Sequence, residues 1–138
     1  KISIFGFAFK ANTNDTRESP AINIAKNLLL EGANLSIYDP KVNKEKIDYE
    51  FGSCISDYFS VSEKYSCSKA ASVEDAAKDS DAIIILTEWE EFKELEWEKL
   101  FCLMRKPGWI FDTRNVLKKI YFNFPGINFW RVGRDLEN

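Results

Sequence analysis

The feature that most constrains the fold is an alternation of short β-rich runs with longer segments of helical spacing. The first run, residues 2–5, stops at a glycine, and a helical pattern of apolar residues then leads to Gly32. A second β-rich run, residues 35–38, ends at an Asp-Pro turn. Strand, helix and strand in this order form a right-handed unit with parallel strands. The sequence therefore predicts an α/β domain with a mostly parallel sheet.

The same alternation continues to the end of the chain and predicts a sheet of about six strands. The expected strands are residues 2–5, 35–38, 69–71, 82–86, 109–111 and 128–130. The expected helices are residues 17–31, 73–78, 88–105 and 117–122, with a short helix and a loop-rich insertion between 41 and 69. The continuous β-branched run 82–86 is typical of a central strand buried on both faces. The predicted fold is one Rossmann-like three-layer sandwich, and 138 residues suffice for a single domain of this kind.

The composition argues against several classes of partner. The net charge is −3, and no block of Lys or Arg is long enough to follow a phosphate backbone, so no nucleic acid is expected. The longest apolar runs are too short to cross a bilayer, so no membrane association is expected. The first residues do not form a signal peptide, and a chain that begins inside a strand is expected to be part of a longer protein.

The cysteines and the lack of histidine bear on chemistry and location. The chain has an odd number of cysteines, Cys54, Cys67 and Cys102, and their spacing matches no zinc or redox motif. This pattern favours a reducing, cytoplasmic location. Cys102 falls in an apolar stretch and is predicted to be a core thiol rather than a nucleophile. The chain has no histidine, the commonest general base and metal ligand. The commonest residue type for both roles is therefore absent, and no metal site is expected.

The first segment that could bind a ligand is the loop of residues 6–19, called the first loop below. It contains only Gly6, so it lacks the G-x-G-x-x-G pattern of a dinucleotide-binding turn. Turn-forming Asn and Asp residues make a plain surface connection one interpretation. The other is an anion site, because Lys10 and Arg17 are cations and the free amides at a helix start favour negative charge.

The second such segment is residues 112–115, called the second loop below. Ligands of parallel α/β sheets bind beyond the carboxyl ends of the strands, where the strand order reverses. Arg114 follows a strand there, and its planar guanidinium suits phosphate and ribose oxygens. An Arg114 paired with Asp112 merely to fix the turn is the alternative. The two loops could converge on one anionic ligand.

Other polar and aromatic residues are given structural roles. Asp39 ends the second strand, where Rossmann domains often bind ribose, but a turn is the favoured interpretation because the glycine-rich loop is missing. The glutamates between residues 88 and 98 alternate with lysines and are expected to form a solvated helix face rather than a metal site. Trp89, Trp97 and Trp109 are expected in the core.

Several separated motifs follow one another along the chain. They are Gly6-Phe7-Ala8-Phe9-Lys10, Asn14-Asp15-Thr16-Arg17-Glu18-Ser19, Glu31-Gly32-Ala33, Ile37-Tyr38-Asp39-Pro40-Lys41-Val42, Leu86-Thr87-Glu88-Trp89, Phe92-Lys93-Glu94-Leu95 and Ile110-Phe111-Asp112-Thr113-Arg114-Asn115. In this order they resemble the C-terminal domain of UDP-glucose 6-dehydrogenases, within the UDP-glucose/GDP-mannose dehydrogenase family. The resemblance spans almost the whole chain and is weakest between residues 44 and 69.

The resemblance implies roles for four residues. Phe9 and Lys10 would contact the UDP-sugar, and Arg114 would hold it from the second loop. Arg17 would reach an NAD that is bound mainly by a preceding N-terminal domain. The whole enzyme would oxidise UDP-glucose to UDP-glucuronate with two NAD⁺, using catalytic residues that lie before this chain, and would form a homo-oligomer.

Two alternatives stay open at this point. The sugar could differ, since dehydrogenases of UDP-N-acetylmannosamine and GDP-mannose have similar C-terminal domains. The chain could also be a stand-alone nucleotide-binding module.

Overall fold

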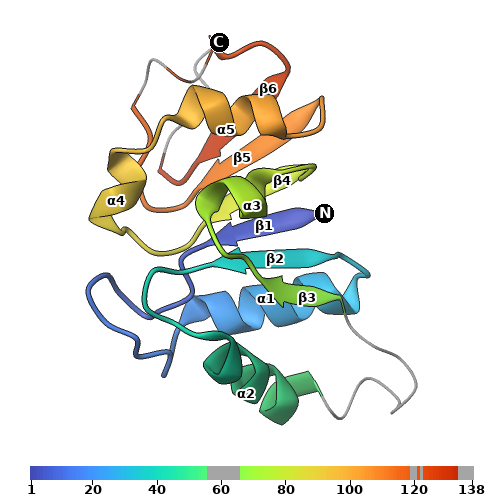
Figure 1. Ribbon diagram of the computed structural model, residues 1–138, viewed down its shortest axis with the longest axis vertical. Coiled ribbons are helices and arrows are strands. Elements are labelled where there is room, and N and C mark those ends of the chain that lie inside the picture. The colour runs from blue at the N-terminus through green and yellow to red at the C-terminus, as the bar shows by residue number, and fades with distance from the viewer. Residues whose placement is uncertain (56–65, 119–120, 122, 134–138) are drawn as a thin grey trace.

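The structure is a computed structural model that describes residues 1–55, 66–118, 121 and 123–133. Its sheet is built from β1 (Ile2–Phe5), β2 (Leu35–Tyr38), β3 (Cys67–Lys69), β4 (Ala82–Ile85), β5 (Gly108–Asp112) and β6 (Ile127–Arg131). The strand order is β3-β2-β1-β4-β5-β6, and all neighbouring strands run parallel (Figure 1). The predicted Rossmann-like α/β fold with about six strands is confirmed.

Helices cover the sheet from both sides and complete the three layers. They are α1 (Pro20–Leu30), α2 (Lys44–Ile55), α3 (Val73–Ala77), α4 (Glu90–Lys93) and α5 (Trp97–Leu103). In Figure 1, α3 and α5 pack together in front of the sheet, and α1, with α2 against it, lies behind β2 and β3. The strand order reverses between β1 and β4, because the chain continues from β1 toward β2 and from β4 toward β5, on opposite sides. Right-handed crossovers in opposite directions place their helices on opposite faces of the sheet.

The helix α1 begins three residues later than predicted, at Pro20 rather than at Arg17. Glu18 has a φ of +60°, which no α-helix accommodates. Ser19 is the N-cap residue, and its side chain accepts a hydrogen bond from the Ala21 amide. Proline is favoured at the first helical position, since its missing N–H would have no helical partner there.

The predicted single helix over residues 88–105 is wrong, because two short helices, α4 and α5, occupy this segment. The apolar spacing changes between Phe92 and Trp97, which are five positions apart, whereas one helical face requires three or four. The break lets both rings pack on Phe5, with centroid distances of 5.5 and 5.7 Å. The buried residues of this segment are Trp89, Phe92, Trp97, Leu100, Phe101 and Met104.

The less regular segments agree with the predictions in part. The helix expected after residue 41 is α2, and the strand expected at 69–71 is β3, which begins two residues earlier. Residues 56–65 of the predicted insertion lie outside the described residues. Of the helix predicted at 117–122, the described residues form no α-helix, and residues 119, 120 and 122 are not described.

The face of the sheet opposite α5 is incompletely covered at β4, β5 and β6. Ile84 is only partly buried, and Trp109 and Trp130 are 44% and 40% exposed. Both tryptophans contact Phe111, with ring centroids 5.7 and 6.2 Å apart. Phe129, the residue before Trp130, points to the opposite face and contacts Phe101 of α5. The expectations that residues 82–86 are buried on both faces and that Trp109 is a core residue are therefore wrong, whereas Trp89 and Trp97 are buried.

The prediction that Cys102 is a core thiol is also wrong, because this residue is exposed on α5. The buried side of α5 consists of Trp97, Leu100 and Phe101. Successive helical residues are rotated by about 100°, so the position after Phe101 turns toward solvent.

Candidate functional site

Both candidate loops lie at the carboxyl edge of the sheet, on either side of the end of β4. The first loop follows β1 and the second follows β5, and β4 separates these two strands. The Thr87 hydroxyl donates to the Ala8 carbonyl at 2.8 Å, which joins the end of β4 to the first loop. Arg114 donates through Nε to the Leu86 carbonyl at 2.9 Å, which joins the second loop to the same strand end. Residues Leu86 and Thr87 therefore bring the two loops together.

Gly6 allows the close approach of the first loop to β4. A Cβ atom placed on this glycine would lie 2.5 Å from Cβ of Thr87, and its φ is +90°. Both facts exclude a larger residue. In a dinucleotide-binding domain the glycine turn makes room for a pyrophosphate, whereas here Thr87 occupies the space beside Gly6.

Asp39 has the structural role that the sequence favoured. Its carboxylate is buried and accepts five hydrogen bonds, from the amides of Phe7, Ala8, Lys41 and Val42 and from Nε1 of Trp89. A carboxylate offers about four lone-pair sites, so these donors leave none for ribose hydroxyls. The turn interpretation of Asp39 is therefore confirmed. Trp89 reaches Asp39 from beyond β4 and covers the place where the strand order reverses.

The predicted binding residues of the first loop point into solvent. Phe9 is 49% exposed, and Lys10 is exposed beside it. The Phe9 amide donates to the Asp15 carbonyl at 2.8 Å, which closes the tip of the loop. The arrangement presents an aromatic ring and a cation together on a braced backbone.

Arg17 is strongly exposed, with 86% of its side chain accessible. It forms a bidentate pair with Asp15, with 2.7 Å between Nη2 and Oδ2. This hydrogen bond holds the pKa of the Asp15 carboxyl well below its ordinary value and raises the pKa of Arg17. An exposed pair of this kind contributes little to stability, so its guanidinium can exchange Asp15 for another anion at small cost.

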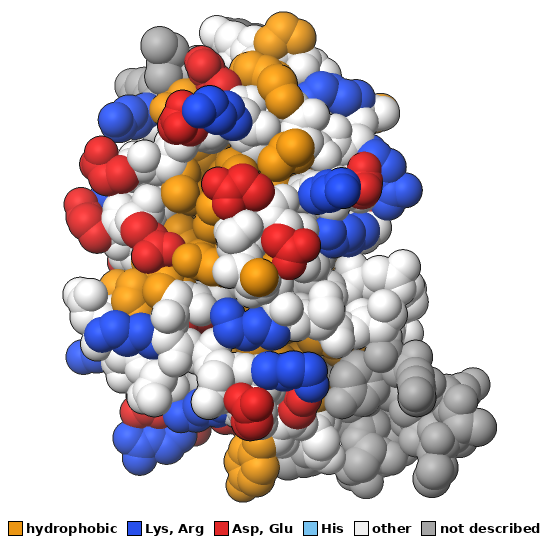
Figure 2. Space-filling view, viewed as in Figure 1, with side chains coloured by type: hydrophobic (Ala, Val, Ile, Leu, Met, Phe, Trp, Pro, Cys, Tyr) orange, Lys and Arg blue, Asp and Glu red, His pale blue; other side chains and the backbone are white. Residues whose placement is uncertain are grey.

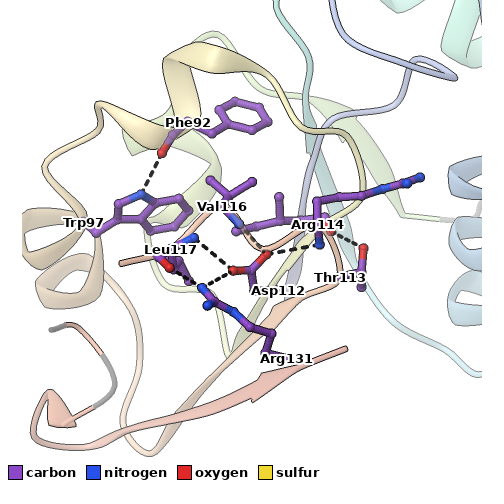
Figure 3. A network of polar contacts seen from close by, with 9 residues as sticks. Phe92, Trp97, Asp112, Thr113, Arg114, Val116, Leu117 and Arg131 are labelled. Carbon is purple, nitrogen blue, oxygen red and sulfur yellow. Dashed lines mark hydrogen bonds and ion pairs between the residues drawn. The ribbon is translucent and has the colours of Figure 1, made fainter. Parts of the chain in front are cut away.

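The second loop is organised by Asp112, which is buried at the end of β5 (Figure 3). Its carboxylate accepts from the amides of Arg114, Val116 and Leu117 at 2.9 to 3.2 Å. Arg131 of β6 completes the set, with 2.8 Å between Nη2 and Oδ2. The alternative in which the Arg114 side chain pairs with Asp112 is therefore wrong, because Arg131 is the cation that neutralises this carboxylate.

The Arg114 side chain is directed away from Asp112 (Figure 3). Its Nε is held by the Leu86 carbonyl and lies 3.5 Å from the Glu88 carboxylate. The neighbouring Thr113 hydroxyl donates to the Ile85 carbonyl at 2.6 Å. With the Nε edge anchored, the orientation of the guanidinium plane is set before any ligand arrives.

The structure thus places the predicted site residues at one edge, although no hydrogen bond or ion pair joins Phe9, Lys10 or Arg17 to Arg114 in the described residues. Sequence reasoning missed two residues that build the site, Thr87 and Arg131. Thr87 was visible only as one letter of the motif Leu86-Thr87-Glu88-Trp89, and nothing in the sequence pairs Arg131 with Asp112.

Charged side chains elsewhere form no cluster suited to a metal within the described residues. The glutamates between 88 and 98 are all exposed, as predicted, but they do not form one helix face, because only Glu90, Glu91 and Glu98 lie in helices. On the face shown in Figure 2, acidic and basic side chains are interspersed. No described helix has the length and apolar character to cross a membrane.

Comparison with known proteins agrees with this geometry. The domain has a Rossmann-like sheet and two loops with cations at its carboxyl edge. These features place it in the class of nucleotide-binding α/β domains. Residues 3–119 match the UDP binding domain of the UDP-glucose/GDP-mannose dehydrogenase family. The chain belongs to this family.

Relatives of known name share the resemblance over nearly the whole chain. UDP-glucose 6-dehydrogenase 4 of Arabidopsis thaliana is 38% identical over 145 residues, which cover 99% of this chain and 30% of the relative. UDP-glucose 6-dehydrogenase of Gallus gallus is 43% identical over 133 residues, covering 94% of this chain and 26% of the relative. The chain therefore spans less than a third of the length of these relatives.

Solved structures support the same fold. The UDP-D-ManNAc dehydrogenase of Pyrococcus horikoshii superposes with a TM-score of 0.67 at 29% identity, over 96% of this chain and 25% of that one. The UDP-N-acetyl-mannosamine dehydrogenase Cap5O of Staphylococcus aureus gives 0.62 at 27% identity, over 95% of this chain and 26% of that one.

Proposed function

We propose that this chain is the C-terminal nucleotide-sugar-binding domain of a UDP-glucose 6-dehydrogenase. The observation that carries the proposal is the meeting of the two cation-bearing loops at the end of β4. The family membership adds that the bound nucleotide is a uridine diphosphate. A diphosphate that lies across this edge would meet Lys10 from one side and Arg114 from the other.

The two cations suit different parts of such a ligand. Arg114 has a fixed plane because its Nε is anchored on the Leu86 carbonyl, and a planar fork binds phosphate or vicinal hydroxyl oxygens with two parallel bonds. Lys10 is a flexible point charge that adapts to the diphosphate. Phe9 offers an exposed ring beside Lys10, against which an apolar edge of the sugar or base can pack.

The domain's own Rossmann crevice does not fit NAD. Thr87 fills the place of the pyrophosphate beside Gly6, and the Asp39 carboxylate is fully occupied. We therefore assign the binding of NAD mainly to a preceding domain. From this chain, only Arg17 at the exposed rim is proposed to contact that cofactor.

In the complete protein, the proposed activity is oxidation of UDP-glucose to UDP-glucuronate with two NAD⁺. We assign no catalytic residue to this chain, so its part is to bind and orient the nucleotide sugar. A homo-oligomer located in the cytoplasm is proposed for the complete enzyme. The reducing location is supported by cysteines that match no disulfide framework.

The test is calorimetric titration of the complete protein with UDP-glucose and with UDP. Arg114→Ala should weaken binding by more than tenfold, or about 1.4 kcal/mol, because a charged hydrogen-bonding group is removed. Arg105→Ala is the matched control, since Arg105 is a half-exposed arginine that pairs with Asp81, near the start of β4 and away from the loops. An unchanged dissociation constant in Arg114→Ala would remove this residue from the site.

A second candidate sugar is favoured by the structural neighbours, two of which are UDP-N-acetylmannosamine dehydrogenases by name. Initial rates of NADH formation with UDP-glucose, UDP-N-acetylmannosamine and GDP-mannose would rank the three. No turnover with any of them, combined with tight binding of UDP, would favour a nucleotide-binding module instead.

A further inference from the structure

The helix α2 lies in the part of the chain where the family resemblance is weakest, yet it contacts the first loop at two separate points. It follows β2 and packs against α1 beside the loop. Two of its residues are involved, Glu50 and Phe51. Neither carries a ligand-binding role in the function proposed above.

The first contact is made by Thr16, which lies between Asp15 and Arg17. Thr16 is fully buried, although the residues on both sides of it are not. Its hydroxyl donates a hydrogen bond to Oε1 of the part-buried Glu50. The acceptor is charged, and charged acceptors form the stronger class of hydrogen bond. A buried threonine held in this way fixes the backbone from which the Arg17 side chain leaves.

The second contact lies at the start of the loop. The ring of Phe7 packs edge-on against Phe51, with centroids 5.8 Å apart and planes inclined by 67°. Both rings are fully buried. The helix thus holds the loop just before Phe9 and Lys10 and again just before Arg17.

The exposed tip is held by local contacts within the part of the chain that the structure describes. Lys10 and the Arg17 side chain both lie at the surface, and Arg17 pairs with Asp15, two residues away. Lys46, one turn before Glu50 on α2, is close enough to contribute a small electrostatic lowering of the Asp15 pKa. The position of the Asp15–Arg17 pair therefore depends on where α2 holds Thr16.

We propose that Glu50 is a positioning residue of the nucleotide site: by accepting the Thr16 hydroxyl, it sets the direction in which Arg17 meets the cofactor. The proposal rests on the function proposed above, because it concerns the same loop. Glu50 acts through Thr16 and touches no substrate.

The test uses the complete protein and steady-state kinetics with NAD and UDP-glucose. Thr16→Val removes the hydroxyl at nearly constant volume, and Glu50→Ala removes the acceptor. Each is expected to raise the KM for NAD about five- to tenfold while kcat stays within about twofold. The double variant should be no worse than the more severe single variant, since both lose the same bond. Glu50→Gln keeps a carbonyl acceptor and should recover most of the affinity.

Glu45→Ala is the matched control, because Glu45 is an exposed acid on the same helix. It should behave as the wild type. The positioning role would be disproved by additive effects in the double variant, by an unchanged KM, or by an equal effect of Glu45→Ala. A purely structural role would lower the melting temperature and the active fraction and leave the KM unchanged.

Hydrogen–deuterium exchange separates this inference from the proposed function. Exchange of the amides in residues 8–18 should rise in Thr16→Val and Glu50→Ala but not in Glu45→Ala, whether or not the protein oxidises UDP-glucose. Unchanged exchange would overturn the positioning role. A wild-type protein that neither binds nor oxidises a nucleotide sugar would overturn the proposed function alone.

Discussion

The two loops at the site are each organised by a buried aspartate, but the two carboxylates are neutralised in different ways. The Asp39 carboxylate receives five neutral N–H donors, and the nearby Lys69 ammonium donates to the Asp39 backbone carbonyl instead. Asp112 receives three amides and the guanidinium of Arg131. The difference shows two ways to bury a charge: one spreads it over many dipoles, and the other pairs it with an opposite charge.

The comparison has a consequence for the cations that remain. Arg131 forms the ion pair with Asp112, so the Arg114 side chain is not needed there. Its Nε instead donates to the Leu86 carbonyl. The described donors to the Asp39 carboxylate are all neutral, and Lys10 and Arg17 of the first loop lie at the surface. Because neither structural carboxylate pairs with Lys10, Arg17 or Arg114, these three cations remain available to an anionic ligand.

The largest effect is expected from Asp112→Ala. This change leaves the Arg131 guanidinium, which is 14% exposed, without its carboxylate, and three amides without an acceptor. Breaking a buried ion pair costs about 3–5 kcal/mol of unfolding free energy. Urea denaturation measures it, with the exposed Asp48→Ala as control. A loss below about 1 kcal/mol would mean that the pair is not buried in solution.

Asp39→Asn is expected to have the next largest effect. The amide keeps one acceptor oxygen but turns its NH₂ group toward amides that also donate. Leaving two or more buried donors unpaired should lower the unfolding free energy by about 2–3 kcal/mol. Glu98→Gln, a change of the same kind at an exposed position, should have no measurable effect. If Asp39→Asn matched that control, the multiple-dipole account of Asp39 would be wrong.

Gly6→Ala tests the close contact that brings the first loop to β4. We expect a loss of about 2 kcal/mol, because the added methyl group overlaps Thr87 and the residue has a positive φ. Gly32→Ala has a similar φ of +89° and nothing within 4 Å, so it isolates the backbone strain. The two variants should differ in denaturation midpoint, and equal losses would show that Thr87 moves away at no cost.

The smallest effect concerns the exposed pair of the first loop. The hydrogen bond from Arg17 lowers the pKa of Asp15 well below its ordinary value of 3.8. A carboxyl whose pKa is lowered by folding stabilises the protein at pH values above its ordinary pKa. This contribution to stability is lost as the pH falls through the folded-state pKa. NMR titration of the Asp15 carboxyl carbon should give a midpoint below the ordinary value, and Arg17→Ala should restore it. An ordinary midpoint in the wild type would show that the pair does not persist in solution.

Much of the fold could be predicted because its signals are local. The runs 2–5 and 35–38 and the turn after Tyr38 mark the first βαβ unit without any tertiary information. Trp109 could not be placed in this way. Trp109 is exposed because α1 and α2 cover a different part of its sheet face. The part that they cover is set by the strand order, which neither the residue type nor the apolar spacing reveals.

The sequence singles out the residues that we propose face the ligand, but not the residues that support them. Lys10 and Arg114 stand out as cations after strands, where an α/β sheet binds ligands. Arg131 is 19 residues from Asp112 and reaches it only because β6 lies beside β5. Asp39 gathers donors from three separate segments, and a sequence does not reveal how many of these donors converge.

The closed crevice between β1 and β4 limits how this domain could be re-engineered. A glycine-rich turn grafted at residues 6–11 would not by itself create a dinucleotide site, because the side chains of Thr87 and Trp89 would still occupy the entrance. Asp39 would also have to give up its present donors before it could hold a ribose. At least three segments would have to change together, and each change alone would cost stability without giving affinity.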